Sequence, residues 1–191
     1  MIDYKKDGID HINIYSKGKT SLGRFLSNFA QADIETEDGN FASIEGYWYW
    51  LICPSTIDPN CKECDGNGVT VLGSGQQTYF GSCNVCSRDY LKELFGKEAK
   101  TYGRELQHNR NFTPPDTDKN LDFQRKIKSA IKFKIDNNPN YKIEFSKSVL
   151  PFEHYYVFYG KVKEVTSHRW VIDYLEELRK EYGKMSTLQT R

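Results

Sequence analysis

Two matched pairs of cysteines constrain the fold of this chain more than any other feature of its sequence. Cys61 and Cys64 form one C-x-x-C pair, Cys83 and Cys86 form a second, and 18 residues separate the pairs. Two such pairs at a separation of about 15–20 residues are typical of a tetrahedral site in which four thiolates bind one zinc ion. Because four cysteines leave no open coordination position, we expect a structural Zn²⁺ rather than a catalytic one.

A pair of disulfides and a redox-active C-x-x-C motif are the alternatives to this zinc site. The chain begins with MIDYKKDGID, which has no apolar signal segment, and no apolar run approaches the roughly 18 residues of a membrane span. We therefore expect a cytoplasmic protein without membrane contact, in which disulfides are rare. The presence of two matched pairs favours a metal over redox chemistry. Cys53 lies outside both pairs and is expected to be a buried apolar residue.

Length and composition indicate one folded domain. The chain has 191 residues, and 14% of them are aromatic, which argues against disorder. The net charge is +1, so no global field attracts nucleic acid and any such contact must be local.

Hydrophobic periodicity and turn residues predict the main elements of secondary structure. Ser43 can cap a helix that begins at Ile44 and ends before Pro54. Asp38-Gly39 predicts a turn. Further helices are expected at 88–106 (with a possible break at Gly96), 119–136 and 167–182, and a strand at 155–165.

Two charged residues stand where the surrounding pattern is apolar. Glu45 lies in the segment FASIEGYWYWLI, where burial would raise the pKa of its carboxyl and suit it to general acid or base chemistry. The alternative is a glutamate placed at a helix start by the helix dipole. Lys134 falls on the apolar stripe of its helix, where it must find an anion, such as an anionic ligand, or extend to solvent.

The segment Glu153-His154-Tyr155-Tyr156 follows Pro151 at the start of the predicted strand. Glu153 and His154 could form a proton-transfer pair, although a structural histidine is the alternative. The tyrosine rings could stack on a base or fill the core.

Four motifs in this order resemble the NADAR (YbiA-like) family. The first is SNF at 27–29 followed by SIEGY at 43–47, and the second is KEAKTYGR at 97–104. AIKFKIDNNP at 130–139 and PFEHYY at 151–156 are the third and fourth. The resemblance implies an α+β fold, a single helix-rich YbiA-like domain over 1–191 with a small sheet. The zinc ribbon at 53–88 would then be an insertion within that domain.

The resemblance also implies hydrolysis of an N-glycosidic bond between a ribose and a base. Family members are linked to phosphoribosylated riboflavin intermediates and to ADP-ribosylated guanine. Glu45 is the candidate carboxylate for stabilising an oxocarbenium-like transition state, with Glu153 as a second acidic group. The candidate substrate-binding residues are Asn28 for a ribose hydroxyl, Lys100, Arg104 and Lys134 for phosphate, Tyr47, Trp48, Tyr155 and Tyr156 for the base, and Phe29 and Gly103.

The leading hypothesis is an N-glycosidase that removes ADP-ribose from modified guanine or a related ADP-ribosyl conjugate. The cysteine insert lies between Glu45 and the Lys100–Arg104 motif, where it could contact a nucleic acid that carries the modified base, or only brace the pocket. A hydrolase of phosphoribosylated riboflavin intermediates is the nearest alternative. Gly46 replaces the histidine of the family motif, which keeps open a catalytically inactive module that binds ADP-ribose or nucleic acid. A zinc-braced interaction protein without a pocket is the remaining alternative.

Overall fold

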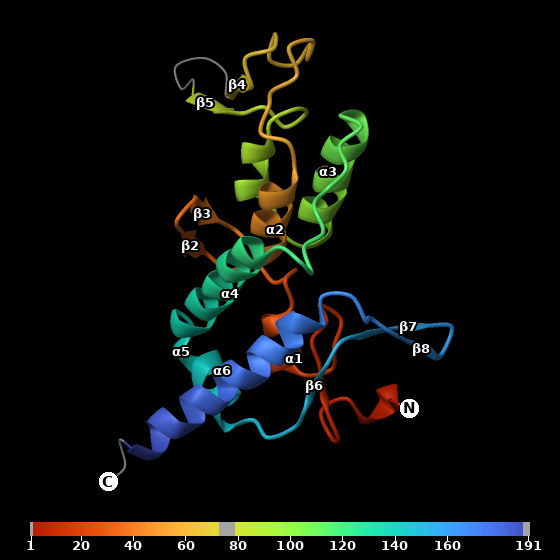
Figure 1. Ribbon diagram of the computed structural model, residues 1–191, viewed down its shortest axis with the longest axis vertical. Coiled ribbons are helices and arrows are strands. Elements are labelled where there is room, and N and C mark those ends of the chain that lie inside the picture. Colours follow the sequence, from red (N-terminus) through yellow and green to blue (C-terminus); the bar gives the residue numbers. More distant parts are fainter. Residues whose placement is uncertain (1, 73–78, 189–191) are drawn as a thin grey trace.

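The structure, a computed structural model, describes residues 2–72 and 79–188, which contain six α-helices and four two-stranded sheets (Figure 1). The helices are α1 (Ser21–Leu26), α2 (Ile44–Ile52), α3 (Gly96–Asn109), α4 (Leu121–Asp136), α5 (Pro139–Lys147) and α6 (Arg169–Leu188), with 3-10 helices η1 (Tyr4–Lys6) and η2 (Arg88–Lys92). The strands are β1 (Ile12–Asn13), β2 (Ile34–Thr36), β3 (Gly39–Phe41), β4 (Val69–Leu72), β5 (Tyr79–Ser82), β6 (Phe152–Glu153), β7 (Tyr155–Phe158) and β8 (Lys161–Glu164).

The strands form four separate ladders in place of the one small sheet that was expected. β2–β3, β4–β5 and β7–β8 are antiparallel hairpins, and only β1–β6 joins distant parts of the chain, as a parallel pair. None of these strands is longer than four residues. The α+β class is confirmed, and helix packing rather than a sheet organises the core.

Helix α2 lies at the centre of that core. Ser43 caps it as predicted, accepting a hydrogen bond from the Gly46 amide at 2.9 Å while its own hydroxyl donates to the Leu94 carbonyl. Most of its residues are buried, and it packs against α3, η2, α4 and the strand β3. The aromatic and aliphatic residues on several faces of this segment explain why most of the helix is buried.

Sequence-based boundaries are partly confirmed and partly wrong. The possible break at Gly96 is confirmed, because the segment 88–106 is divided into η2 and α3, and Gly96, with a φ of +56°, is the first residue of α3. The strand predicted at 155–165 is a hairpin that turns at Tyr159-Gly160. Helix α4 ends at Asp136, as predicted, and Pro139 occupies the first turn of the unpredicted helix α5, where its missing N–H costs nothing.

The cysteine segment projects from one end of the helical body. Figure 1 shows β4 and β5 beyond the ends of α2 and α3, on the opposite side from the chain termini. The four paired cysteines and Ile57 form a small cluster of their own, separate from the main hydrophobic core. Cys53, as expected, is buried in the main core.

Helices α2 and α3 approach so closely that residue 103 can only be glycine. A Cβ on Gly103 would lie 2.2 Å from the ring of Tyr49, well inside van der Waals contact. The Cys53 thiol also reaches the Gly103 carbonyl at 3.3 Å. Gly103, predicted to bind substrate, is therefore a packing residue in this structure.

We expect Gly103→Ala to lower the free energy of unfolding by about 2 kcal/mol or more, because overpacking forces apart two buried helices. Gly183→Ala is the matched control, since the nearest atom to a Cβ there is the Ser146 carbonyl oxygen, 3.9 Å away. It should raise stability by about 0.5–1 kcal/mol through helix propensity. Urea unfolding measures both changes, and equal effects of the two substitutions would contradict the packing argument.

Candidate functional site

Glu45 is a buried acid in the first turn of α2. Its side chain is 8% exposed, and its amide donates to the Asn28 carbonyl at 3.0 Å. Burial raises the pKa of the Glu45 carboxyl to about 7, against the opposing influence of Lys100 and Arg104. Both protonation states are therefore accessible near neutral pH, as a general acid or base requires.

Lys100 and Arg104 face Glu45 from one side of α3. They are four residues apart, so both side chains project from the same face of the helix. Neither forms a salt bridge with any described residue, and Arg104 is exposed. Lys100 lies over the Phe29 ring at 5.4 Å from its centroid. Two cations without a salt-bridge partner beside a buried acid suit an anionic ligand such as a phosphate.

Two tyrosine hydroxyls complete the surroundings of this acid. Burial chiefly raises the pKa of Tyr49, and the Glu45 charge raises it further while Arg104 lowers it. The same three influences act, in the same directions, on Tyr156 of β7. Tyr156 also packs edge-on against Tyr15, at 5.1 Å between ring centroids. The site is thus assembled from α2, α3, the Asn28 loop and the start of the β7–β8 hairpin.

Lys134 is hydrogen-bonded to the loop that carries Asn28. Its ammonium donates to the Ser27 carbonyl at 3.0 Å and lies 4.8 Å from the centroid of the Phe25 ring. The side chain is 1% exposed, and burial lowers its pKa to about 7. The predicted position on the buried stripe of α4 is confirmed, but the partner is a main-chain carbonyl rather than a bound anion.

Close packing explains why residue 46 is a glycine. A Cβ at this position would lie 2.4 Å from the Leu91 carbonyl oxygen and 2.9 Å from that of Leu94. The histidine that the family motif carries here has no room, because η2 and the following residues cover this face of α2.

Other predicted aromatic residues are used for packing. Tyr47 is fully buried on the opposite face of α2 from Glu45 and donates to Asp38 at 2.7 Å. Trp48 packs edge-on against Phe123 and parallel to Trp170, with centroids 4.7 and 5.9 Å away.

Tyr155 is likewise buried, and its hydroxyl lies 2.8 Å from Nε2 of His11. The Asn13 side chain accepts a hydrogen bond from the Tyr155 N–H and donates one to the Tyr155 carbonyl, and this pair of bonds fixes the start of β7. These contacts leave Tyr155 without a surface for a ligand.

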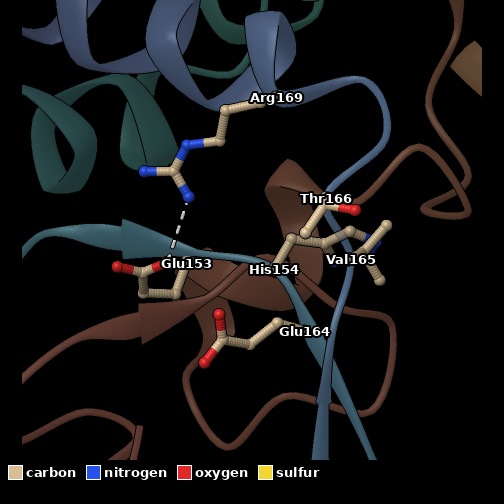
Figure 2. Close-up of a pocket in the computed structure, with 6 residues that line it drawn as sticks. All are labelled: Glu153, His154, Glu164, Val165, Thr166 and Arg169. Atoms are coloured by element: carbon tan, nitrogen blue, oxygen red, sulfur yellow. Dashed lines mark hydrogen bonds and ion pairs between the residues drawn. The ribbon is translucent and has the colours of Figure 1, made fainter. Parts of the chain in front are cut away.

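Glu153 lies beside a small cavity. A hollow of about 150 Å³ is bordered by Glu153, His154, Glu164, Val165, Thr166 and Arg169 (Figure 2). Glu153 is turned toward Arg169, which donates to it at 3.1 Å. Glu153 is thus held in an ion pair with Arg169, and its role as a second acidic group stays a prediction. Within the described part of the chain, His154 Nδ1 is a buried nitrogen without a hydrogen-bond partner.

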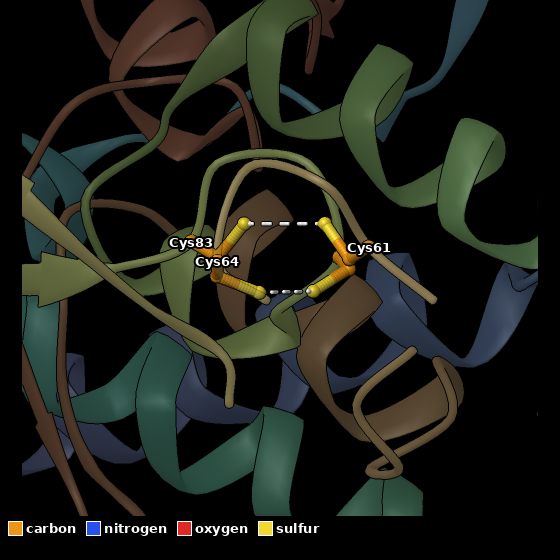
Figure 3. A group of neighbouring side chains, drawn as sticks. Cys61, Cys64 and Cys83 are labelled. Carbon is orange, nitrogen blue, oxygen red and sulfur yellow. Dashed lines mark hydrogen bonds between the residues drawn. The ribbon is translucent and has the colours of Figure 1, made fainter. Parts of the chain in front are cut away.

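The four paired cysteines, Cys61, Cys64, Cys83 and Cys86, meet at one point, and Figure 3 labels the first three of them. Their sulfur atoms all lie within 4.8 Å of one another, with Sγ–Sγ distances of 3.8 Å (Cys61–Cys83) and 3.5 Å (Cys64–Cys86). Zn–S bonds of about 2.3 Å at tetrahedral angles place sulfurs about 3.8 Å apart. The Gly68 amide also donates to Cys64 Sγ at 3.2 Å. This buried cluster can hold a metal ion such as zinc.

Tyr102 connects the cysteine cluster to α3. Its hydroxyl donates to the Ser87 carbonyl at 2.8 Å and lies 3.3 Å from that of Cys83. Tyr102 lies two residues from both Lys100 and Arg104, on the opposite face of α3, so the second C-x-x-C pair is braced against the helix that carries the two cations.

Sequence reasoning missed Tyr49 and Tyr15. Tyr49 follows Glu45 by four residues and so shares its helix face, a signal that was available. No local sequence pattern predicts a role for Tyr15, because the pairing of β1 with β6 is what brings it close to Tyr156.

Comparisons of the chain with protein-family models, with curated proteins and with solved structures found no match. Among the described residues, no helix combines the length and the apolar character needed to cross a lipid bilayer.

Lys134→Met tests the cost of the buried amine. Burial lowers the pKa of Lys134 to about 7 in the folded protein, whereas the pKa in the unfolded chain is about 10.5. The cost of this burial to the free energy of unfolding is therefore full below pH 7 and decreases as the pH rises from 7 toward 10.5. At pH 6 we expect the variant to be more stable, on the order of 2 kcal/mol after loss of the Ser27 hydrogen bond. The gain should diminish by pH 9.5, as followed by urea unfolding.

Lys128→Met, at a partly exposed position of the same helix, is the control and should change stability little at either pH. Equal destabilisation by Lys134→Met at pH 6 and pH 9.5 would mean that the ammonium contact with Ser27 is net stabilising.

Proposed function

We propose that this protein is an N-glycosidase that removes ADP-ribose from modified guanine or a related ADP-ribosyl conjugate. One observation carries the proposal: a buried carboxyl with a pKa of about 7 lies beside two cations that have no salt-bridge partner in the described chain. The order of the four sequence motifs supports the same reaction class. A diphosphate on the cations would place the adjoining ribose near Glu45.

The reaction would proceed as a hydrolysis at the anomeric carbon. The bond from this carbon to the base nitrogen breaks, and its electron pair stays on the nitrogen. Water supplies a hydroxyl to the carbon, and the proton it gives up goes to the base. Ionised Glu45 would stabilise the positive charge that develops on the ribose and orient the water, while Tyr156 borders the same space.

A binding module without turnover is the second candidate, and Gly46 favours it, because no imidazole can occupy that position. The two candidates differ in one observable, which is release of ADP-ribose.

The first experiment is incubation of the protein with ADP-ribosylated guanine in a DNA oligonucleotide and as the free nucleoside conjugate. Glu45→Gln should reduce ADP-ribose release at least about a hundredfold without loss of binding. Below pH 7 the wild-type rate should fall, because protonation removes the Glu45 charge. Chromatography of released ADP-ribose between pH 5 and pH 9 measures both effects.

Glu177→Gln is the control, because Glu177 is an exposed glutamate of α6 and should leave turnover nearly unchanged. Binding of ADP-ribose without turnover by wild type would favour the binding module, and full activity of Glu45→Gln would remove Glu45 from the mechanism. Turnover only of phosphoribosylated riboflavin intermediates would favour the alternative hydrolase.

We further propose that the cysteine cluster binds one structural Zn²⁺, held by Cys61, Cys64, Cys83 and Cys86. Three observations support this assignment. The sulfur atoms are spaced much as in a tetrahedral Zn–S₄ site, all four thiols are buried, and the Gly68 amide donates to Cys64 Sγ.

Cys64→Ser should abolish stoichiometric zinc on elemental analysis and lower the Tm by about 5 °C or more, since about 1 kcal/mol corresponds to 2–4 °C in a domain of this size. Cys53→Ser is the control, because Cys53 is a buried cysteine outside the cluster. It should keep full zinc content. Unchanged metal content in Cys64→Ser would exclude the proposed site.

A further inference from the structure

The β7–β8 hairpin carries an aromatic and basic face of which the contacts above involve only Tyr156, at its inner end. Residues paired across antiparallel strands share a face, so the register Tyr156↔Lys163 and Phe158↔Lys161 places these four side chains together. The other face carries Tyr155, Val157, Val162 and Glu164. The only acidic residue of the hairpin is thus on the opposite face from the two lysines. Figure 1 shows this hairpin extending away from the helical body.

The side chains at the outer end of this face are free. Phe158 is 68% exposed and Tyr159, at the turn, is 91% exposed, and their rings meet edge-on at 4.5 Å between centroids. Lys161 and Lys163 are exposed, and neither has a salt-bridge partner within residues 2–72 and 79–188. Two large exposed rings beside two unpaired cations have no role in folding the domain.

The turn retains an aromatic ring at a backbone cost. Tyr159 and Gly160 both have positive φ values, +48° and +73°, which is typical of a type I′ turn. Asparagine or glycine is the favoured residue at the first position, and a tyrosine there pays for a left-handed conformation. The folding of the hairpin does not explain this choice, whereas a ligand for the ring would.

We propose that the face formed by Tyr156, Phe158, Lys161 and Lys163, with Tyr159 at its tip, binds single-stranded nucleic acid next to the Glu45 site. The proposal rests on the proposed function, and makes the substrate a modified base within a polynucleotide strand. Its inner end is continuous with the site, because Tyr156 interacts with Glu45 and Arg104.

The chemistry of this face matches a single strand. Bases stack on exposed aromatic rings whatever their identity, and lysines contact the phosphates between them. Tyr156 and Phe158 are two residues apart on one strand, about 7 Å, which matches two steps of about 3.4 Å along a stacked nucleic-acid strand. A strand whose modified nucleotide occupies the Glu45 site can therefore place its neighbouring bases on Phe158 and Tyr159.

The experiment measures binding of a short, unmodified, fluorescein-labelled oligothymidylate by fluorescence anisotropy at several salt concentrations. Phe158→Thr and Tyr159→Asn should each weaken binding about tenfold. Asparagine keeps the turn geometry while removing the ring, so loss of the hairpin does not account for the effect. Lys161→Gln with Lys163→Gln should reduce the slope of log K against log salt by about 1.4, the value for two phosphate contacts on a single strand.

Two matched controls locate the surface. Phe80→Thr removes a ring that is 75% exposed on the cysteine hairpin, and Lys147→Gln with Lys180→Gln removes two exposed lysines of α5 and α6. Both should bind like wild type. Absence of wild-type binding, or equal losses in hairpin and control variants, would overturn the proposal.

These outcomes are separable from those of the hydrolysis experiment. Oligothymidylate carries no ADP-ribose, so its binding to the hairpin does not depend on turnover. Hydrolysis of the free nucleoside conjugate without oligothymidylate binding would retain the N-glycosidase and refute the nucleic-acid surface. Binding on the hairpin without hydrolysis of either conjugate would refute the N-glycosidase and retain the surface.

Discussion

The close contact between α2 and α3 is the constraint on which the rest of the structure depends. Glycine at 103 lets the Tyr49 ring lie directly on α3, and glycine at 46 lets the other side of α2 meet the carbonyls that follow η2. With both faces of α2 covered in this way, Glu45 is removed from water while Lys100 and Arg104 remain at the surface. The same contact sets the depth of the acid and the position of the cations, so the electrostatics of the site follow from helix packing.

Two titratable groups are buried at a cost to stability, and both adjoin the Ser27-Asn28 loop. Lys134 holds the loop by the Ser27 carbonyl, and the Glu45 amide holds it by the Asn28 carbonyl. A domain under selection for stability alone would place apolar residues at both positions, because burying a charge is expensive. Strained or costly features of this kind concentrate at functional sites. The cysteine cluster adds a second brace, since Tyr102 joins it to α3.

Features with a local cause were predictable from sequence, and features set by tertiary packing were not. The C-x-x-C spacing predicted the cysteine cluster, and the Ser43 cap predicted the start of α2, because each depends on residues close in the chain. The apolar neighbourhood of Glu45 predicted that its side chain is buried, and the structure confirms that burial. Tyr47 and Tyr155 were assigned by proximity in sequence, although their helix face and strand face point away from Glu45. The ion-pair partner of Glu153 could not be predicted from the sequence, because Arg169 belongs to α6 and meets Glu153 only through tertiary packing.

The environment of Lys134 has a consequence for chemical reactivity. An amine whose pKa lies near 7 is largely unprotonated at mildly alkaline pH, and is then a stronger nucleophile than an ordinary surface lysine. Yet its nitrogen is covered by the loop that includes Ser27, so an acylating reagent reaches it only when this loop lifts. The rate of acylation at Lys134 therefore reports how often the Ser27-Asn28 loop opens. A bound ligand that holds this loop in place would slow the labelling.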